Sequence, residues 1–294
     1  MKKIVHFIQY ILFICFVRLF QFFGLNISRK IIKCIATIIF YLIPIRKKIV
    51  EKNLRIAFPN LTKSEIEKLA LKSYISIGYT FVEFFIFETL SEEKIRNLIY
   101  FNNSQLVEDI IKSKKAAILL TAHFGNWELG AISFPVLFNL KLSVLYKKMH
   151  NPYVTEWLIK VRNRFNNSVA VGLSLKEIIY ELKQNKVVGI VADQRAPKDS
   201  TIQVNFFNTG ITSFSGPASL AVKFNIPIYF VISNRNEDYT YNCDIMPIEY
   251  NQDVSDSEKI IQITQKYYTL LENYIKKYPE QWFWLHNRWK HINI

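Results

Sequence analysis

One turn of this chain carries a base and a carboxylate at a spacing that suits proton transfer. His123 and Glu128 lie five residues apart, with Gly125 and Asn126 between them. A neutral imidazole can take a proton from a hydroxyl, and a carboxylate can hold the ring in the required tautomer. The pair is therefore a candidate for general-base catalysis. The alternative is a hydrogen-bonded structural histidine at a turn.

The flanking segments decide how the two side chains can meet. The short apolar run Ala116–Leu120 predicts a buried strand, and the longer run Leu129–Phe138 predicts a helix. On one continuous helix, residues five apart would diverge by roughly 140°. We therefore expect His123 in the strand-to-helix turn and Glu128 in the first helical turn, with Asn126 as the N-cap. Asn126 is also a candidate for substrate binding.

The chain after residue 116 alternates between strand and helix patterns. Strands are predicted at 116–121, 142–146, 169–171, 187–192, 228–233 and 239–246, and helices at 126–138, 152–165, 174–184, 216–224 and 257–277. A loop is expected between 193 and 215. This alternation predicts an α/β fold with a mixed, mostly parallel sheet flanked by helices. In such sheets the ligand crevice lies at the carboxyl ends of the strands, here His123, Tyr146 and Asp193.

Further polar residues follow these strands. Asp193, Gln194 and Arg195 could position a substrate or stabilise negative charge; the alternative is a local salt bridge. Lys147 closes the second strand, and Arg162 and Arg164 close the next helix. These cations could bind phosphates, or they could simply be solvated surface residues.

Several enzyme classes are disfavoured because their motifs are missing. The sequence has no Gly-x-Ser-x-Gly elbow, P-loop, Gly-x-Gly-x-x-Gly or His-Glu-x-x-His. No metal site and no cofactor are predicted, because the remaining histidines could form a metal site only by long-range convergence. The three cysteines, Cys15, Cys34 and Cys243, are expected to be ordinary buried thiols.

The N-terminal region suggests a membrane. Two apolar runs, Ile4–Phe23 and Ile31–Ile45, are interrupted by polar residues, so neither gives the ~20 apolar residues of a clear spanning helix. The formal net charge of +14 predicts an anionic partner. The basic residues that flank the runs fit anionic headgroups and disfavour nucleic acid. We expect residues 1–48 to be an anchor that dips into or crosses the cytoplasmic leaflet. The alternative is a hydrophobic hairpin packed on the main domain, residues 49–294.

Two aromatic segments complete the pattern. The predicted helix from Thr62 to about Glu88 carries many aromatic residues, which favours the core over a lipid groove. The segment 279–290 is too rich in tryptophan to be a free tail. We expect it to dock on the domain, with the membrane interface as the alternative.

Four segments in order resemble the lipid A biosynthesis acyltransferases, within the broader lysophospholipid acyltransferase group that carries a His-x4-Asp/Glu motif. The segments are His123–Glu128; Asn53-Leu54 with Phe58-Pro59; Asp193-Gln194 with Phe206-Phe207 and Gly216-Pro217-Ala218; and Gln281-Trp282 through Trp289-Lys290. The resemblance spans nearly the whole chain.

The resemblance implies an acyltransferase domain over residues 49–294 that acts on the cytoplasmic face of the inner membrane. The acyl donor would be an acyl carrier protein thioester, or a coenzyme A thioester, and the acceptor a hydroxyl of an anionic lipid A precursor glycolipid. His123 would deprotonate that hydroxyl and Glu128 would orient the base. The hydroxyl would then attack the thioester directly, without an acyl-enzyme. One departure concerns Lys147, which stands where relatives often carry arginine; lysine cannot form the bidentate fork.

Two other functions stay open. The acceptor could be another membrane lipid, such as a phosphatidylinositol mannoside or an amino-acid lipid. The protein could also be a non-catalytic lipid-binding relative, although the intact His123 and Glu128 argue against that.

Overall fold

A mixed sheet forms the centre of the computed structural model, which describes residues 2–146, 149–165, 168–171, 175–195 and 201–291. Its seven strands follow the order β1-β9-β8-β2-β5-β3-β4. Every neighbouring pair is parallel except β8 with β9. The predicted α/β fold is therefore confirmed. The strands are β1 (Ile99–Phe101), β2 (Ala117–Thr121), β3 (Leu142–Tyr146), β4 (Ser168–Val171), β5 (Val187–Val191), β8 (Ile228–Arg235) and β9 (Tyr241–Pro247).

The strand β2 shows why the central strands are continuous apolar runs. Its alternate residues enter two different cores: Ile118 and Leu120 join one cluster, and Ala117 and Leu119 join the other. A parallel strand covered by helices on both faces needs apolar side chains at every position.

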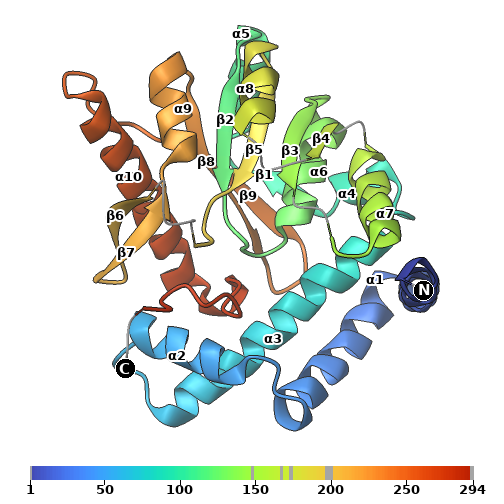
Figure 1. Ribbon diagram of the computed structural model, residues 1–294. Helices are drawn as coiled ribbons and strands as arrows, with labels where there is room; N and C mark the ends of the chain where they lie inside the picture. Colours follow the sequence, from blue (N-terminus) through green and yellow to red (C-terminus); the bar gives the residue numbers. More distant parts are fainter. Residues whose placement is uncertain (1, 147–148, 166–167, 172–174, 196–200, 292–294) are drawn as a thin grey trace.

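The helices cover both faces of the sheet and its carboxyl edge. In Figure 1, α9 and α10 lie to one side of the sheet and α4, α6 and α7 to the other, while α2 and α3 lie below the strand ends. The helices are α1 (Lys2–Leu42), α2 (Lys47–Ala57), α3 (Lys63–Ile86), α4 (Glu92–Arg96), α5 (Ser104–Ser113), α6 (Trp127–Phe138), α7 (Pro152–Asn163), α8 (Leu175–Lys183), α9 (Gly216–Phe224) and α10 (Asp256–Lys277).

The expectation of a loop between residues 193 and 215 is wrong, because this segment contains a β-hairpin. Strand β6 (Thr201–Phe206) pairs with β7 (Thr209–Phe214) in a separate two-stranded sheet. The two linking residues, Phe207 and Asn208, have φ of 52° and 53°. Two consecutive positive φ values are typical of a type I′ turn, whose twist matches that of the strands.

Helix α1 is broken at Gly24, where φ is 67° and ψ is −179°. The chain before the break is seen nearly end-on in Figure 1, and the chain after it runs across the view beside α3. Val17, Phe20 and Phe40 are buried in the two core clusters, whereas much of the remaining apolar surface of α1 is exposed. Cys15 and Cys34 are exposed, so only Cys243 is the buried thiol that we expected.

Helix α3 is the second helix long and apolar enough to cross a membrane, but most of it is buried. It begins with a capping box between Thr62 and Glu65. Tyr74, Tyr79 and Phe84 are buried, as expected for core residues, whereas Phe81 is exposed.

Candidate active site

The turn after β2 is fixed by close backbone contacts. Gly125 has φ of +54°, and a Cβ there would lie 1.8 Å from the carbonyl oxygen of Ser233, so only glycine fits. Asn126 is the N-cap of α6, as predicted, because its Oδ1 accepts a hydrogen bond from the N–H of Leu129 at 2.9 Å. The turn therefore holds His123 at a defined place at the carboxyl edge of the sheet.

Asp193 is the carboxylate that hydrogen-bonds His123. Nδ1 of His123 lies 2.7 Å from Oδ1 of Asp193, and the backbone N–H of His123 donates to Oδ2 at 3.1 Å. The strands β2 and β5 are parallel neighbours with Thr121 opposite Val191, so the residues that follow both strands meet. With Nδ1 held by Asp193, Nε2 is the nitrogen that remains for a substrate. It lies 3.5 Å from the side-chain nitrogen of Gln194.

Glu128 hydrogen-bonds a different residue. Nε and a terminal nitrogen of Arg162 donate to its two carboxylate oxygens at 3.0 and 2.5 Å. The expectation that Glu128 orients the imidazole is thus corrected: the first turn of α6 directs Glu128 toward α7, while Asp193 reaches Nδ1 from the neighbouring strand end. Glu128 still acts on His123 through its charge.

The two members of the His123–Asp193 pair shift each other's pKa. Burial would lower the pKa of His123, but the charge and hydrogen bond of Asp193, together with the charge of Glu128, raise it above the ordinary value. Burial would raise the pKa of Asp193, but His123 and the indole N–H of Trp282 outweigh burial and lower it. Only 3% of the Asp193 side chain is exposed, compared with 22% for His123. Asp193 is therefore a partner of the base, whereas His123 can be reached from outside.

The C-terminal segment closes the site from one side. The indole N–H of Trp282 donates to Oδ2 of Asp193 at 2.9 Å. The backbone N–H of Gly125 donates to the carbonyl of Gln281, and that of Phe283 to the carbonyl of His123, both at 2.9 Å. Trp282, Trp284 and Trp289 are almost fully buried, which confirms that this segment docks on the domain. The sequence marked the segment as apolar but gave no sign of its bond to Asp193.

Two aromatic rings flank the imidazole of His123. The centroid of the Trp127 ring lies 5.1 Å away and that of Phe283 lies 5.8 Å away. The two rings form an apolar wall beside the imidazole of His123.

Asn53 of α2 ties the C-terminal segment to the helical layer below the sheet. Its Nδ2 donates to the carbonyls of Trp284 and His286 at 2.8 and 2.7 Å. The ring Nε2 of His286 accepts the backbone N–H of Arg195 at 3.0 Å. Burial lowers the pKa of His286 and outweighs the charge of Asp193, which would raise it. The charges of Arg288 and Arg46, and of His123 when it is protonated, also lower it. A neutral His286 thus positions the chain after Asp193.

A buried polar network lies behind the turn. Nδ2 of Asn126 donates to Glu83 at 2.7 Å, and Glu83 also accepts from Arg29 at 2.8 Å and from the Tyr241 hydroxyl at 2.5 Å. Asn126 has no exposed surface, and both ends of its amide are engaged. The substrate-binding role predicted for Asn126 is therefore corrected: it positions α6.

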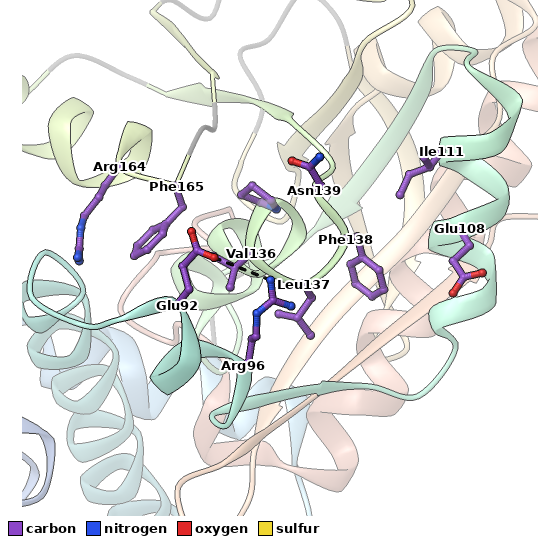
Figure 2. A pocket seen from close by; sticks show the side chains of 11 residues that line it. Glu92, Arg96, Glu108, Ile111, Val136, Leu137, Phe138, Asn139, Arg164 and Phe165 are labelled. Carbon is purple, nitrogen blue, oxygen red and sulfur yellow. Dashed lines mark ion pairs between the residues drawn. The ribbon is translucent and has the colours of Figure 1, made fainter.

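Arg164 lies elsewhere. It donates to the carbonyl of Phe87 at 2.5 Å and lines a surface cleft of about 600 Å³. Figure 2 shows that cleft with Phe165, Val136–Asn139 and the ion-paired Glu92 and Arg96. These residues include Phe138 at the C-terminal end of α6, roughly 15 Å along the helix from Glu128. Arg164 is therefore not part of the His123 site. Lys147 lies outside the described residues.

The comparisons with known proteins agree with the resemblance. A family model described as "Bacterial lipid A biosynthesis acyltransferase" matches residues 1–291. The chain is similar to the lipid A biosynthesis lauroyltransferase of Escherichia coli (strain K12), with 27% identity over 248 residues, 83% of this chain and 79% of the relative. It is also 23% identical to the Escherichia coli lipid A biosynthesis palmitoleoyltransferase and to a Shigella flexneri lipid A biosynthesis acyltransferase, with the same coverage. The chain belongs to the bacterial lipid A biosynthesis acyltransferase family, and it is an acyltransferase.

Proposed function

We propose that the protein moves a fatty acyl group from an acyl thioester, carried by acyl carrier protein or coenzyme A, to a hydroxyl of a lipid A precursor. The observation that carries the proposal is the His123–Asp193 pair. Its buried carboxylate lies 2.7 Å from Nδ1 and leaves Nε2 outside this hydrogen bond, while the His123 side chain is partly exposed. The names of the relatives support the class of acceptor.

The proposed reaction uses His123 as the base. Nε2 takes the proton of the acceptor hydroxyl as the oxygen attacks the thioester carbonyl. The tetrahedral intermediate then collapses, the C–S bond breaks, and the imidazolium returns the proton to the thiolate. Asp193 fixes the tautomer and stabilises the imidazolium. No acyl-enzyme is needed, so no nucleophilic side chain is required.

Glu128 and Arg162 form the second part of the proposed machinery. The bidentate pair fixes the guanidinium near the N-terminus of α6, where the first backbone N–H groups have no intrahelical partner. Either group could stabilise the oxyanion or bind a substrate phosphate. Gln194 and Arg195 are proposed to contact the substrate beside Nε2.

The proposed site works at the cytoplasmic face of the inner membrane. The exposed apolar surface of α1 and the net charge of +14 support binding to an anionic membrane surface. The positive charge also supports an acidic carrier protein as the donor.

The test is acyl transfer by purified full-length protein, with the product identified by mass spectrometry. Donors on acyl carrier protein and on coenzyme A are compared, and a lipid A precursor is compared with a phospholipid acceptor. We expect His123→Ala and Glu128→Ala to abolish transfer to the glycolipid. His150 is an exposed histidine, so His150→Ala serves as the control and should stay active. Full activity of His123→Ala would refute the base assignment, and acylation of the phospholipid alone would refute the acceptor.

A further inference from the structure

The chain after Gly24 has the surface pattern of a helix that lies flat at a membrane. Exposed apolar residues follow one stripe at helical spacing: Ile27, Cys34, Ile38 and Tyr41. A polar stripe runs beside it, with Asn26, Lys30 and Lys33 exposed and Thr37 half-buried. Neighbouring apolar and basic stripes let a helix sink one face into the acyl region while its lysines reach the headgroups.

The chain before Gly24 also exposes apolar residues along its whole length, including Ile4 (65%), Leu12 (67%), Leu19 (50%) and Phe22 (83%). No described element covers these side chains. A membrane surface could therefore contact both parts of α1, on either side of the break.

The opposite side of this first part is tied to the globular domain. Asn151 donates to the carbonyl of His6 at 2.7 Å, and Gln21 donates to the carbonyl of Phe85 at 2.8 Å. Between these contacts, the rings of Phe7 and Tyr10 pack on Tyr153. The contacts span fifteen residues of helix, or roughly 22 Å.

These contacts conflict with a helix that crosses the bilayer. If residues 6–21 spanned the hydrocarbon, α7 would enter it as well. Helix α7 exposes Glu156 and Lys160, and charged side chains are strongly disfavoured at that depth. A helix parallel to the surface leaves the same residues in water.

We propose that both parts of α1 lie in the plane of one anionic leaflet and that the chain does not cross the bilayer. The inference rests on the membrane association proposed above and adds the orientation of α1 relative to the bilayer. Anionic lipid fits the surface better than a second copy of the chain, because a two-fold contact through this part of α1 would place Lys30 and Lys33 of both copies in one interface without adding negative charge. The break at Gly24 lets two segments with different directions follow one surface.

The test measures how deep a spin label attached to the full-length protein lies in the bilayer of vesicles made with and without anionic lipid. Single labels are placed at Ile4→Cys, Ile11→Cys and Leu19→Cys in a Cys15→Ser, Cys34→Ser background. Cys243 is buried and stays unlabelled in the folded protein. In-plane binding predicts that the three labels differ in depth by less than about 5 Å. A spanning helix predicts that Ile11→Cys lies roughly 10 Å deeper than the other two, from a rise of 1.5 Å per residue.

A matched pair after Gly24 checks the orientation. A label on native Cys34 should be in lipid, and a label on Lys33→Cys, one residue earlier and also exposed, should be in water. Lys3→Cys and Asp253→Cys should react with an impermeant reagent from the same side of sealed vesicles.

Three results would overturn the proposal: a depth maximum at Ile11→Cys, labelling of Lys3→Cys from the side opposite Asp253→Cys, or a dimer that buries α1 and does not bind vesicles. Acyl transfer measured on each labelled protein separates these outcomes from failure of the proposed function. A depth maximum with normal activity would refute the geometry alone.

Discussion

The replacement Asp193→Asn tests the assignment of the orienting carboxylate. Oδ2 of Asp193 accepts the backbone N–H of His123 at 3.1 Å and the indole N–H of Trp282 at 2.9 Å. An asparagine keeps both bonds if its oxygen takes the place of Oδ2. Its NH2 group then faces Nδ1 of His123, where the carboxylate oxygen had accepted at 2.7 Å. Two donors cannot face each other, so the proton moves to Nε2 and the base is lost.

The expected loss in kcat is about 10²- to 10⁴-fold, the usual contribution of a general base. The pH profile should change as well. A base must be neutral to act, and Asp193 and Glu128 raise the pKa of His123, so wild-type activity should rise with pH through a value above 6.5. Without the charge of Asp193, burial dominates and the pKa of His123 falls. The residual activity of Asp193→Asn should therefore begin to rise at a lower pH.

The assay is kcat against pH for transfer from an acyl thioester, with a thermal melt to check folding. Glu181→Gln is the matched control. Its carboxylate accepts from Ser143 at 2.5 Å and from Lys186 at 2.9 Å, near the amino end of β5, whereas Asp193 follows the carboxyl end of the same strand. Glu181→Gln should leave the pH profile unchanged. A folded Asp193→Asn protein with wild-type kcat and an unshifted profile would refute the assignment.

Three further predictions follow from contacts around the same turn. Trp282→Phe removes a hydrogen bond to a charged group and should lower kcat about tenfold. Trp284→Phe loses a hydrogen bond to a backbone carbonyl and should change only the melting temperature. Equal kcat in the two variants would contradict this reasoning. Gly125→Ala places a Cβ 1.8 Å from a backbone oxygen at positive φ, so we expect a loss of about 3 kcal/mol or more in unfolding free energy, measured by denaturant titration. Glu128→Gln and Arg162→Lys should be strongly non-additive in kcat/KM, with a coupling of about 1–3 kcal/mol in a double-mutant cycle; additive effects would show that the two side chains act separately.

Local patterns in the sequence were enough to predict the elements that build the site. The apolar run before His123 has the length of a strand and the run after Glu128 the length of a helix, and both form as expected. Asn126 caps α6 because a short polar side chain can satisfy a backbone N–H two or three residues ahead. The hairpin 201–214 was missed, because its turn, Phe207-Asn208, lacks the glycine that usually signals two positive φ values.

The partners of the site residues could not be predicted in the same way. Asp193 is seventy residues from His123, and the two meet only because β2 and β5 pair in register. Glu128, which the motif spacing offered as the partner of His123, is directed instead toward Arg162.

The sequence by itself therefore determined the fold class, the strand-to-helix turn with its histidine, the apolar N-terminus and the family resemblance. Only the tertiary structure decided that Asp193 holds His123, that Trp282 holds Asp193, and that Arg164 lies elsewhere. The physical reason is range. Propensity, capping and periodicity act within a few residues, so the local sequence determines them. Hydrogen-bond partners depend on strand order and register, which bring together residues that are distant in sequence.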